Sequence, residues 1–485
     1  MWRQDLELAN DGLFIENIKS EYTEAETGLI VEALTLFRSL QPTAYSSIKE
    51  IAQLLADQKA DANVVLCAFL APLLWENFCP LSEIEEKFGH KPSQILSHFI
   101  LPPICRTDTE VHRHTDTQTL LSVFSGNIEQ TILFLAFRTA ELEQNINESS
   151  GNYKKLADEA LDFLVPVASR LNLGKLRRRL EKAAFRLTNP TAYAELESRV
   201  EPIQADDNEC LAILKNAVYQ VLSKHRIKAE IQGRIKSLYS IHSKMQRTGK
   251  SFEEILDRLG LRIIVKTVPQ CYSVLGLIHT HYQPVPNSFD DYVGLPKDNG
   301  YQSLHTCVYP VRNISHKPIE FQIRTELMHK EAEYGVAAHW QYKEKGKEIA
   351  EDDYQKTLWM KGLAKQHHNM TSKDFISMLH KQMHEDAMVV FGNAGQILRL
   401  PEKSTVSHYL EKANITCAPG TVIKVNGVAI SLNHILSDGD SIEVLPLDKG
   451  AENNLPQSVN EDFPKSPGAA VFNKSPPLTV RQETI

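Results

Sequence analysis

Hydrophobic residues in the first 195 positions recur three and four residues apart, which is the spacing of one face of an α-helix. Two clear cases are the runs Ile48 to Leu55 and Leu156 to Leu164. Patterns typical of strands are nearly absent from this part of the chain. The spacing therefore predicts an all-helical domain over residues 1–195.

The pattern changes within residues 196–345. The run Leu261 to Val265 is rich in β-branched residues, which predicts a buried strand. A second strand is predicted where Ile319, Phe321 and Ile323 alternate with polar residues. The order from here on is strand, helix, loop, strand, strand, helix, which predicts a mixed sheet with helices packed against it.

The chain after residue 345 divides into three predicted segments. Residues 346–386 are charged with helical spacing, which is typical of a linker helix. Residues 387–448 show short strand patterns with tight turns around one short helix, which predicts a small β-grasp-sized domain. Residues 449–485 are rich in Pro, Asn, Ser and Gly, so we expect a disordered tail. The fold class is multidomain α+β.

Composition excludes several classes of protein. With 53 Lys and Arg against 61 Asp and Glu, the net charge of -8 argues against a protein that coats DNA or other nucleic acid, so a phosphate site must be local. The longest apolar run, Val64 to Trp75, is too short for a bilayer and contains Pro72, which favours a buried helix. The N-terminus has no apolar run typical of a signal peptide, so we expect a cytoplasmic protein. The 7 cysteines form no Cys-x-x-Cys pair, which favours reduced thiols over a zinc site.

A basic segment runs from Gly233 to Met245. On a helix beginning near Gly233, the side chains of Lys236, Ser240 and Lys244 would share one face. Acidic residues are almost absent around them, so their charge is uncompensated locally. This favours a row of phosphate-binding donors over the alternative of a solvated face.

Two further features point to nucleotide chemistry. The turn-forming run before Tyr301 brings Lys297, Asn299 and Tyr301 together, which suits phosphate contact, hydrogen bonding to a base edge and ring stacking. Asp257 precedes one predicted strand and Glu320 lies in another. Two such carboxylates could hold Mg²⁺ together with substrate phosphates, or each could be an ordinary salt-bridge partner.

These segments resemble the RelA/SpoT homologue family, the synthetases of the stringent-response alarmones ppGpp and pppGpp. The resemblance extends over residues 20–447 and rests on the basic segment, Asp257 and three further strings, Pro296 to His305, Glu320 to Thr325 and Glu333 to Trp340. It implies transfer of pyrophosphate from ATP to the ribose 3′-OH of GTP or GDP, with AMP released. The alternative within the family is a catalytically silent regulator that binds nucleotide or tRNA.

The resemblance also implies a role for each matched residue. Asp257 and Glu320 would be Mg²⁺ ligands, and Glu320 would act as general base on the 3′-OH. The residues implied for ATP are Arg234, Lys236, Ser240 and Lys244. The residues implied for GTP or GDP are Lys297, Asn299, Tyr301, Gln302, His305 and Gln322, with the Tyr301 ring stacked on the base.

The helical half resembles the family's HD-type alarmone hydrolase, which holds Mn²⁺ through His, His-Asp and Asp. Those four ligand positions are occupied here by Ser47, Ala71, Pro72 and Phe137. Without them nothing would lower the pKa of the attacking water, so we expect a pseudo-hydrolase rather than a bifunctional enzyme.

The implied architecture is thus a helical pseudo-hydrolase, a nucleotidyltransferase-like mixed-sheet synthetase and a TGS-like β-grasp domain. The TGS-like domain could contact tRNA or the ribosome, although residues 413–420 offer no histidine. No ribosome-anchoring modules follow it, so we expect control to differ from that of long family members.

Overall fold

The computed structural model describes residues 2–97, 99, 127–146, 151–255, 257–297, 299–309, 311, 317–337, 359, 362, 374, 377–379, 387–392, 396–401, 403–415 and 421–445. The chain forms two compact units, Met1–Glu385 and Asp386–Ile485. The expected tail, nearly all of the expected linker and the end of the Glu333 to Trp340 string lie outside the described residues.

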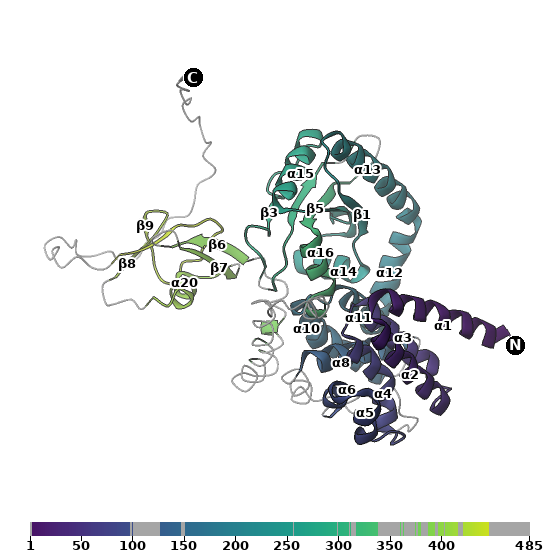
Figure 1. Cartoon of the computed structure of the whole chain (residues 1–485). Helices are drawn as coiled ribbons and strands as arrows, with labels where there is room; N and C mark the ends of the chain where they lie inside the picture. The colour runs from purple at the N-terminus through teal and green to yellow at the C-terminus, as the bar shows by residue number, and fades with distance from the viewer. Residues whose placement is uncertain are drawn as a thin grey trace, which may run out of the picture. The chain divides into compact units, whose positions relative to one another are not determined.

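The first unit begins with helices, as predicted (Figure 1). They are α1 (Trp2–Glu21), α2 (Glu24–Leu40), α3 (Tyr45–Asp57), α4 (Ala62–Trp75), α5 (Leu81–Phe88), α6 (His90–Leu96), α8 (Ile128–Gln144), α9 (Gly151–Glu159), the π-helical turn η2 (Ala160–Leu164), α10 (Val165–Arg170), α11 (Gly174–Thr188) and α12 (Pro190–Val200). Residue 195, the expected end of the helical domain, falls inside α12.

Helix α4 is the centre of the helical core. Its residues from Val64 to Leu73 are all buried, because α2, α3, α6 and α8 pack around it. Asp61 caps its first turn by accepting a hydrogen bond from the backbone of Asn63 at 2.9 Å. The prediction of a buried helix here is confirmed. Among the described helices, none combines the length and apolar content needed to cross a bilayer.

The sheet follows the long helix α13 (Gln204–Lys224). Its elements are β1 (Glu230–Ile235), α14 (Leu238–Thr248), β2 (Leu259–Val265), α15 (Val268–His281), β3 (Asp290–Asp291), β4 (Leu304–Val308), β5 (Ile319–Thr325) and α16 (Glu326–Tyr334), with the short 3₁₀ turns η3 (Glu201–Ile203) and η4 (Phe252–Glu254) before α13 and β2. The strand order is β1-β2-β5-β4-β3, and only the β2–β5 pair is parallel. The predicted mixed sheet is confirmed.

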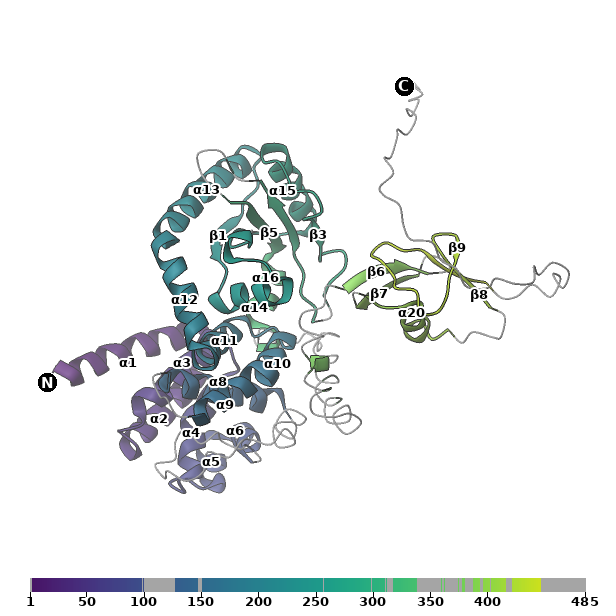
Figure 2. The same ribbon diagram turned by 180° about the vertical axis from the view of Figure 1, so that it is seen from behind.

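One face of this sheet is apolar. Leu261 pairs with Phe321 and Ile263 pairs with Ile323, and all four are fully buried. Helices α13 and α15 cover this face in both views of the molecule (Figures 1 and 2). The polar residues of β5 therefore point to the opposite face, as the alternation predicts.

The predicted helix start near Gly233 is wrong, because residues Glu230–Ile235 form β1 and pair antiparallel with β2. Helix α14 begins only at Leu238, where Ser237 accepts a hydrogen bond from the backbone of Ser240 at 3.2 Å. Lys236 lies in the turn between them, and its N–H donates to the carbonyl of Arg258 at 2.9 Å. Pairing with a strand distant in sequence overrides the local helical spacing.

The second unit contains the strands and short helix that the sequence predicts. They are β6 (Ala387–Phe391), β7 (Ile397–Pro401), α20 (Val406–Lys412), β8 (Val422–Val425), β9 (Val428–Ala429) and β10 (Ile442–Leu445). Strands β10, β8 and β9 form one sheet, and β6 pairs with β7. Val390, Tyr409 and Ile442 are fully buried in a core of the unit's own. Residues 416–420 lie outside the described residues.

Candidate active site

The polar face of the sheet aligns charged side chains across neighbouring strands. Arg234 pairs with Gly260, Gly260 with Glu320, and Glu320 with Cys307, so one row crosses β1, β2, β5 and β4. Arg234 Nη1 lies 2.9 Å from Glu320 Oε2. A Cβ on Gly260 would lie 3.6 Å from the same oxygen and 3.0 Å from the Glu320 carbonyl. Glycine here therefore leaves room beside the carboxylate.

Asp257, just before β2, lies between the two lysines of the basic segment. Its Oδ2 accepts from Lys236 Nζ at 2.7 Å and from Lys244 Nζ at 2.6 Å. Burial alone would raise the pKa of Asp257, but the lysines outweigh it and hold the pKa at about 2. The prediction that the charge of these lysines is uncompensated is therefore wrong for the folded chain. Asp257 lies outside the basic segment in sequence but contacts both lysines in the fold.

The second oxygen of Asp257 differs from the first. Oδ1 is buried and has no hydrogen-bond partner among the described residues. A buried carboxylate oxygen without a donor is unfavourable unless a cation or another donor approaches it. Ser240 lies on the first turn of α14, between Lys236 and Lys244 in sequence, and its hydroxyl accepts from Ser237 at 2.9 Å.

The loop before β4 carries four of the residues predicted for the guanine nucleotide, namely Lys297, Asn299, Tyr301 and Gln302. It closes with a hydrogen bond from the Gly300 backbone to the Lys297 carbonyl at 2.7 Å, and Gly300 has a positive φ of 77° that suits glycine. The Tyr301 hydroxyl lies 2.9 Å from His305 Nε2. Asn299 Oδ1 accepts from the Tyr301 backbone at 3.1 Å.

The two glutamines predicted for this site have different surroundings. Gln302 donates to the carbonyl of Val293 at 3.1 Å, within its own loop. Gln322 is buried and donates to Glu320 Oε2 at 3.0 Å. Gln322 thus supports the carboxylate from inside the sheet.

His305 completes the surroundings of Glu320. Its Nδ1 lies 3.6 Å from Glu320 Oε1. Burial, and then the positive charges of Arg234 and Lys297, hold the pKa of His305 well below its usual range. The imidazole is therefore neutral at physiological pH.

A buried ionic cluster below the site was not predicted from the sequence. The carboxylate of Glu333, on α16, lies 2.7 Å from Arg178 of α11, 3.2 Å from Arg262 of β2 and 3.4 Å from Arg324 of β5. Burial alone would raise the pKa of Glu333, but the arginines hold it at about 2. The available signal was Arg262 itself, since an arginine inside an apolar strand needs a buried carboxylate.

Replacing Glu333 by Gln should lower the free energy of unfolding by roughly 3 kcal/mol at neutral pH, because three arginines lose their shared counter-ion. The folded pKa is below the ordinary 4.5, so this stabilisation is complete above 4.5 and is lost as the pH falls towards about 2. Denaturant unfolding at several pH values measures both effects. The exposed Glu326→Gln on the same helix is the matched control, and equal stability of the two variants would contradict the prediction.

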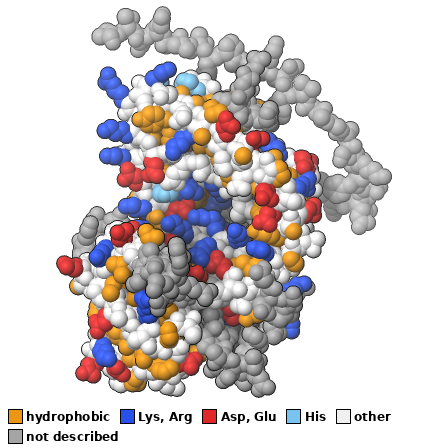
Figure 3. Space-filling view, turned by 90° about the vertical axis from the view of Figure 1, so that its right-hand side faces the viewer, with side chains coloured by type: hydrophobic (Ala, Val, Ile, Leu, Met, Phe, Trp, Pro, Cys, Tyr) orange, Lys and Arg blue, Asp and Glu red, His pale blue; other side chains and the backbone are white. Residues whose placement is uncertain are grey.

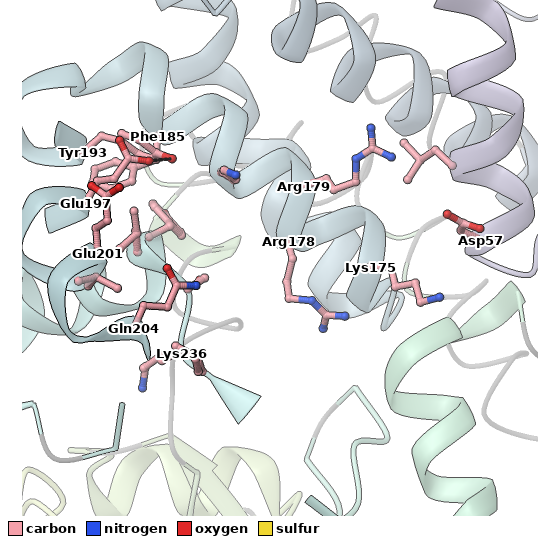
Figure 4. A pocket seen from close by; sticks show the side chains of 17 residues that line it. Asp57, Lys175, Arg178, Arg179, Phe185, Tyr193, Glu197, Glu201, Gln204 and Lys236 are labelled. Atoms are coloured by element: carbon pink, nitrogen blue, oxygen red, sulfur yellow. Dashed lines mark hydrogen bonds between the residues drawn. The ribbon is translucent and has the colours of Figure 1, made fainter. Parts of the chain in front are cut away.

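A cavity of about 1030 Å³ lies beside Lys236, at the turn that leads into α14. Figure 4 shows Lys236 on one side of it and Lys175, Arg178 and Arg179 of α11 on the other. Asp257 and Glu320 do not line this cavity, so it lies beside the carboxylates rather than over them. Figure 3 shows Lys and Arg gathered with acidic side chains in a hollow of the molecular surface.

The helical half also packs directly against helix α14, which carries Lys244. The Phe185 ring of α11 stacks on His242 at 4.7 Å and contacts the Tyr239 ring edge-on at 5.8 Å. Phe185, Tyr193 and Ile241 are all buried in a small core shared by α11, α12 and α14. The position of Lys244 on α14 therefore depends on packing against the helical half.

The four positions predicted to have lost hydrolase ligands lie on helices that pack together, α3, α4 and α8. Ala71 and Phe137 are buried, and the Phe137 ring packs against Phe99 at 6.2 Å. Within the described ranges, no three His, Cys, Asp or Glu side chains are grouped so that they could hold a metal ion.

Comparison with known proteins identifies two regions of the chain. Residues 233–347 match the model of the region found in RelA/SpoT proteins, and residues 388–450 match the ThiS family. The first match contains every residue predicted for the active site.

Curated relatives align over most of this chain. The GTP pyrophosphokinase of Myxococcus xanthus is 29% identical over 82% of this chain and 53% of its own length. The GTP pyrophosphokinase of Escherichia coli K12 is 29% identical over 82% of this chain and 54% of its own length. A guanosine-3′,5′-bis(diphosphate) 3′-pyrophosphohydrolase of Aquifex aeolicus is 32% identical over 81% of this chain and 56% of its own length. The chain thus spans about half the length of these relatives.

Among solved structures, small alarmone synthetase 1 of Bacillus subtilis, bound to its product pppGpp, is 23% identical over 36% of this chain and 96% of its own, with a TM-score of 0.26. That likeness is too slight to bear on function. The sequence matches are the stronger finding: residues 233–347 contain the region found in RelA/SpoT proteins, and the chain is similar to GTP pyrophosphokinases over about four fifths of its length.

Proposed function

We propose that this protein is a (p)ppGpp synthetase that transfers pyrophosphate from ATP to the 3′-OH of GTP or GDP. The observation that carries the proposal is one sheet face where Glu320 and Asp257 lie beside Arg234, Lys236 and Lys244, inside the RelA/SpoT region. The 3′-oxygen forms a bond to the β-phosphorus of ATP, the bond to the α,β-bridging oxygen breaks, and AMP leaves.

The donor side of the site would neutralise phosphate charge. Lys236 and Lys244 converge on one point, and Arg234 lies in the neighbouring row of the sheet. Phosphoryl transfer needs mainly in-line positioning and charge neutralisation, which such cations supply. ATP binding would exchange their present carboxylate partners for phosphate oxygens, with Ser240 at the start of α14 as a further contact.

Asp257 and Glu320 are the residues that would hold Mg²⁺. The buried Oδ1 of Asp257, to which no described residue donates, and the room that Gly260 leaves beside Glu320 fit a cation with few protein ligands. When bound, the ion would neutralise charge on the transferred phosphates.

The acceptor side would be the loop before β4. We propose that Tyr301 stacks on guanine, that Asn299, Gln302 and His305 shape the pocket and that Lys297 meets phosphate. Glu320 would accept the proton of the 3′-OH, and Gln322 and neutral His305 keep its carboxylate in place.

The assay is direct. Purified full-length protein with ATP, GTP and Mg²⁺ should release AMP and a 3′-pyrophosphorylated guanosine in equal amounts. Nucleotide binding without AMP release would favour the alternative, a silent regulator. Release of ADP, or no reaction with either guanine nucleotide, would overturn the proposal.

We propose further that the helical half is an HD-type pseudo-hydrolase. With Ser47, Ala71, Pro72 and Phe137 at the ligand positions, Mn²⁺ has no oxygen or imidazole set to bind. We therefore expect no Mn²⁺-dependent release of pyrophosphate from ppGpp, measured by chromatography with an EDTA-treated sample as control. Pyrophosphate release that requires Mn²⁺ would contradict this, and it is a fair test because one relative is named a pyrophosphohydrolase.

The remaining parts extend the same proposal. The sheet region would be nucleotidyltransferase-like, and the second unit, matched by the ThiS family, would be a TGS-like β-grasp domain with a contact to tRNA or the ribosome. Because the proposed substrates are ATP and guanine nucleotides, which are abundant in the cytoplasm, we propose that the reaction takes place there.

A further inference from the structure

The turn between α10 and α11 belongs to the helical half but reaches the acceptor loop. Its central residue, Asn172, has a positive φ of 55° and is only 6% exposed. Asn172 Nδ2 donates to the carbonyl of Asn299 at 2.7 Å. In return, Asn299 Nδ2 donates to the carbonyl of Ser169 at 3.2 Å. Residues about 130 positions apart are thus joined by two hydrogen bonds.

This turn is held rigidly against the synthetase region. A Cβ on Gly335 would collide with the carbonyl of Leu171, and Val336 N–H donates to that carbonyl at 3.3 Å. A Cβ on Gly174 would lie only 3.0 Å from the carbonyl of Ala332. The backbones therefore approach as closely as glycine allows, which gives Asn172 a fixed position relative to α16.

From Asn299 the contacts continue to the carboxylate. Asn299 Oδ1 accepts from the Tyr301 backbone at 3.1 Å, the Tyr301 hydroxyl lies 2.9 Å from His305 Nε2, and His305 Nδ1 lies 3.6 Å from Glu320 Oε1. The chain of contacts runs from the helical half to the proposed base.

We infer that Asn172 is a positioning residue of the acceptor site. It holds the Asn299 backbone, and through it Tyr301, in the conformation that receives the guanine nucleotide. This rests on the proposed function of the loop. The helical half then contributes to synthesis through a contact with the acceptor side, although it contributes no residue to the reacting groups.

The test compares variants of the full chain. Asn172→Gly keeps the positive φ at no steric cost but removes the amide, and Asn172→Asp keeps the shape but sets a carboxylate against the Asn299 carbonyl. The matched control is Asn77→Gly, an exposed positive-φ asparagine of the helical half with φ 57°. GDP affinity by calorimetry and the separate KM values for GTP and ATP are measured, together with the melting temperature.

We expect Asn172→Gly to weaken GDP binding and raise the KM for GTP roughly five- to tenfold, the effect of one hydrogen bond, and Asn172→Asp to do so more strongly. The KM for ATP and the melting temperature should match those of Asn77→Gly. Unchanged GDP affinity, an equal rise in the KM for ATP, or tighter GDP binding would overturn the inference. Failure of the wild type to make alarmone while it binds GDP would overturn only the proposed function, and absence of GDP binding would overturn both.

Discussion

Replacing Glu320 by Gln is expected to lower the turnover number by roughly a hundredfold to ten-thousandfold, while ATP and GTP still bind. The amide keeps the size of the side chain and still accepts a hydrogen bond from Gln322, but it cannot take the proton of the 3′-OH. Arg234 loses its partner, but it is 39% exposed, so stability should change by less than about 1 kcal/mol. The measurement is pre-steady-state formation of alarmone at saturating nucleotide.

The control for this variant is Glu230→Gln. Glu230 also lies on the sheet, but it is exposed at the start of β1, where its carboxylate accepts a hydrogen bond from Gln232 at 2.8 Å. It should behave as wild type. If Glu320→Gln kept more than about a tenth of wild-type turnover, Glu320 would not be the base, and the cations of the site would account for catalysis by positioning alone.

The features that the sequence predicted correctly are those that depend only on residues close together in the chain. The alternation in β5 predicted which side of the strand carries Glu320, because strand geometry fixes the faces residue by residue. The run ending at Gly300 predicted a tight loop, because glycine tolerates its positive φ. Both features follow from the residues next to one another in the chain, so they could be predicted without knowing the rest of the fold.

What the sequence could not predict depends on residues far apart. The segment around Gly233 has helical spacing, and only its pairing with β2 makes it a strand. Glu333 forms ion pairs with arginines of α11, β2 and β5. Asn172 of the helical half forms a hydrogen bond with Asn299 of the sheet region. Arg262 inside an apolar strand indicates that a buried carboxylate is needed, but no local pattern identifies Glu333 as that carboxylate or joins Asn172 to Asn299.

Charge illustrates the same limit. The sequence around Lys236 and Lys244 contains almost no acid, yet both ammonium groups contact one carboxylate in the fold. The local excess of positive charge is therefore a property of the segment and not of the site. In the fold, one oxygen of the Asp257 carboxylate accepts hydrogen bonds from both lysines, and the other has no donor among the described residues.

Asp257→Asn is accordingly expected to affect stability and catalysis together. Lys236 and Lys244, with side chains 17% and 29% exposed, would lose their shared counter-ion, at a cost of roughly 3 kcal/mol in the free energy of unfolding. The folded pKa of about 2 lies below the ordinary 3.8, so this stabilisation is complete above 3.8 and fades as the pH falls towards 2. Alarmone synthesis should fall at least about a hundredfold, because the proposed Mg²⁺ ligand is also lost.

The two effects can be separated by a second substitution. Adding Lys236→Met to Asp257→Asn removes one of the unpaired buried charges while keeping the apolar stem, so part of the lost stability should return. Synthesis should stay as low as in Asp257→Asn, since neither the carboxylate nor the lysine is restored. Recovery of synthesis along with stability would contradict both the proposed role of Asp257 in binding Mg²⁺ and that of Lys236 in binding ATP.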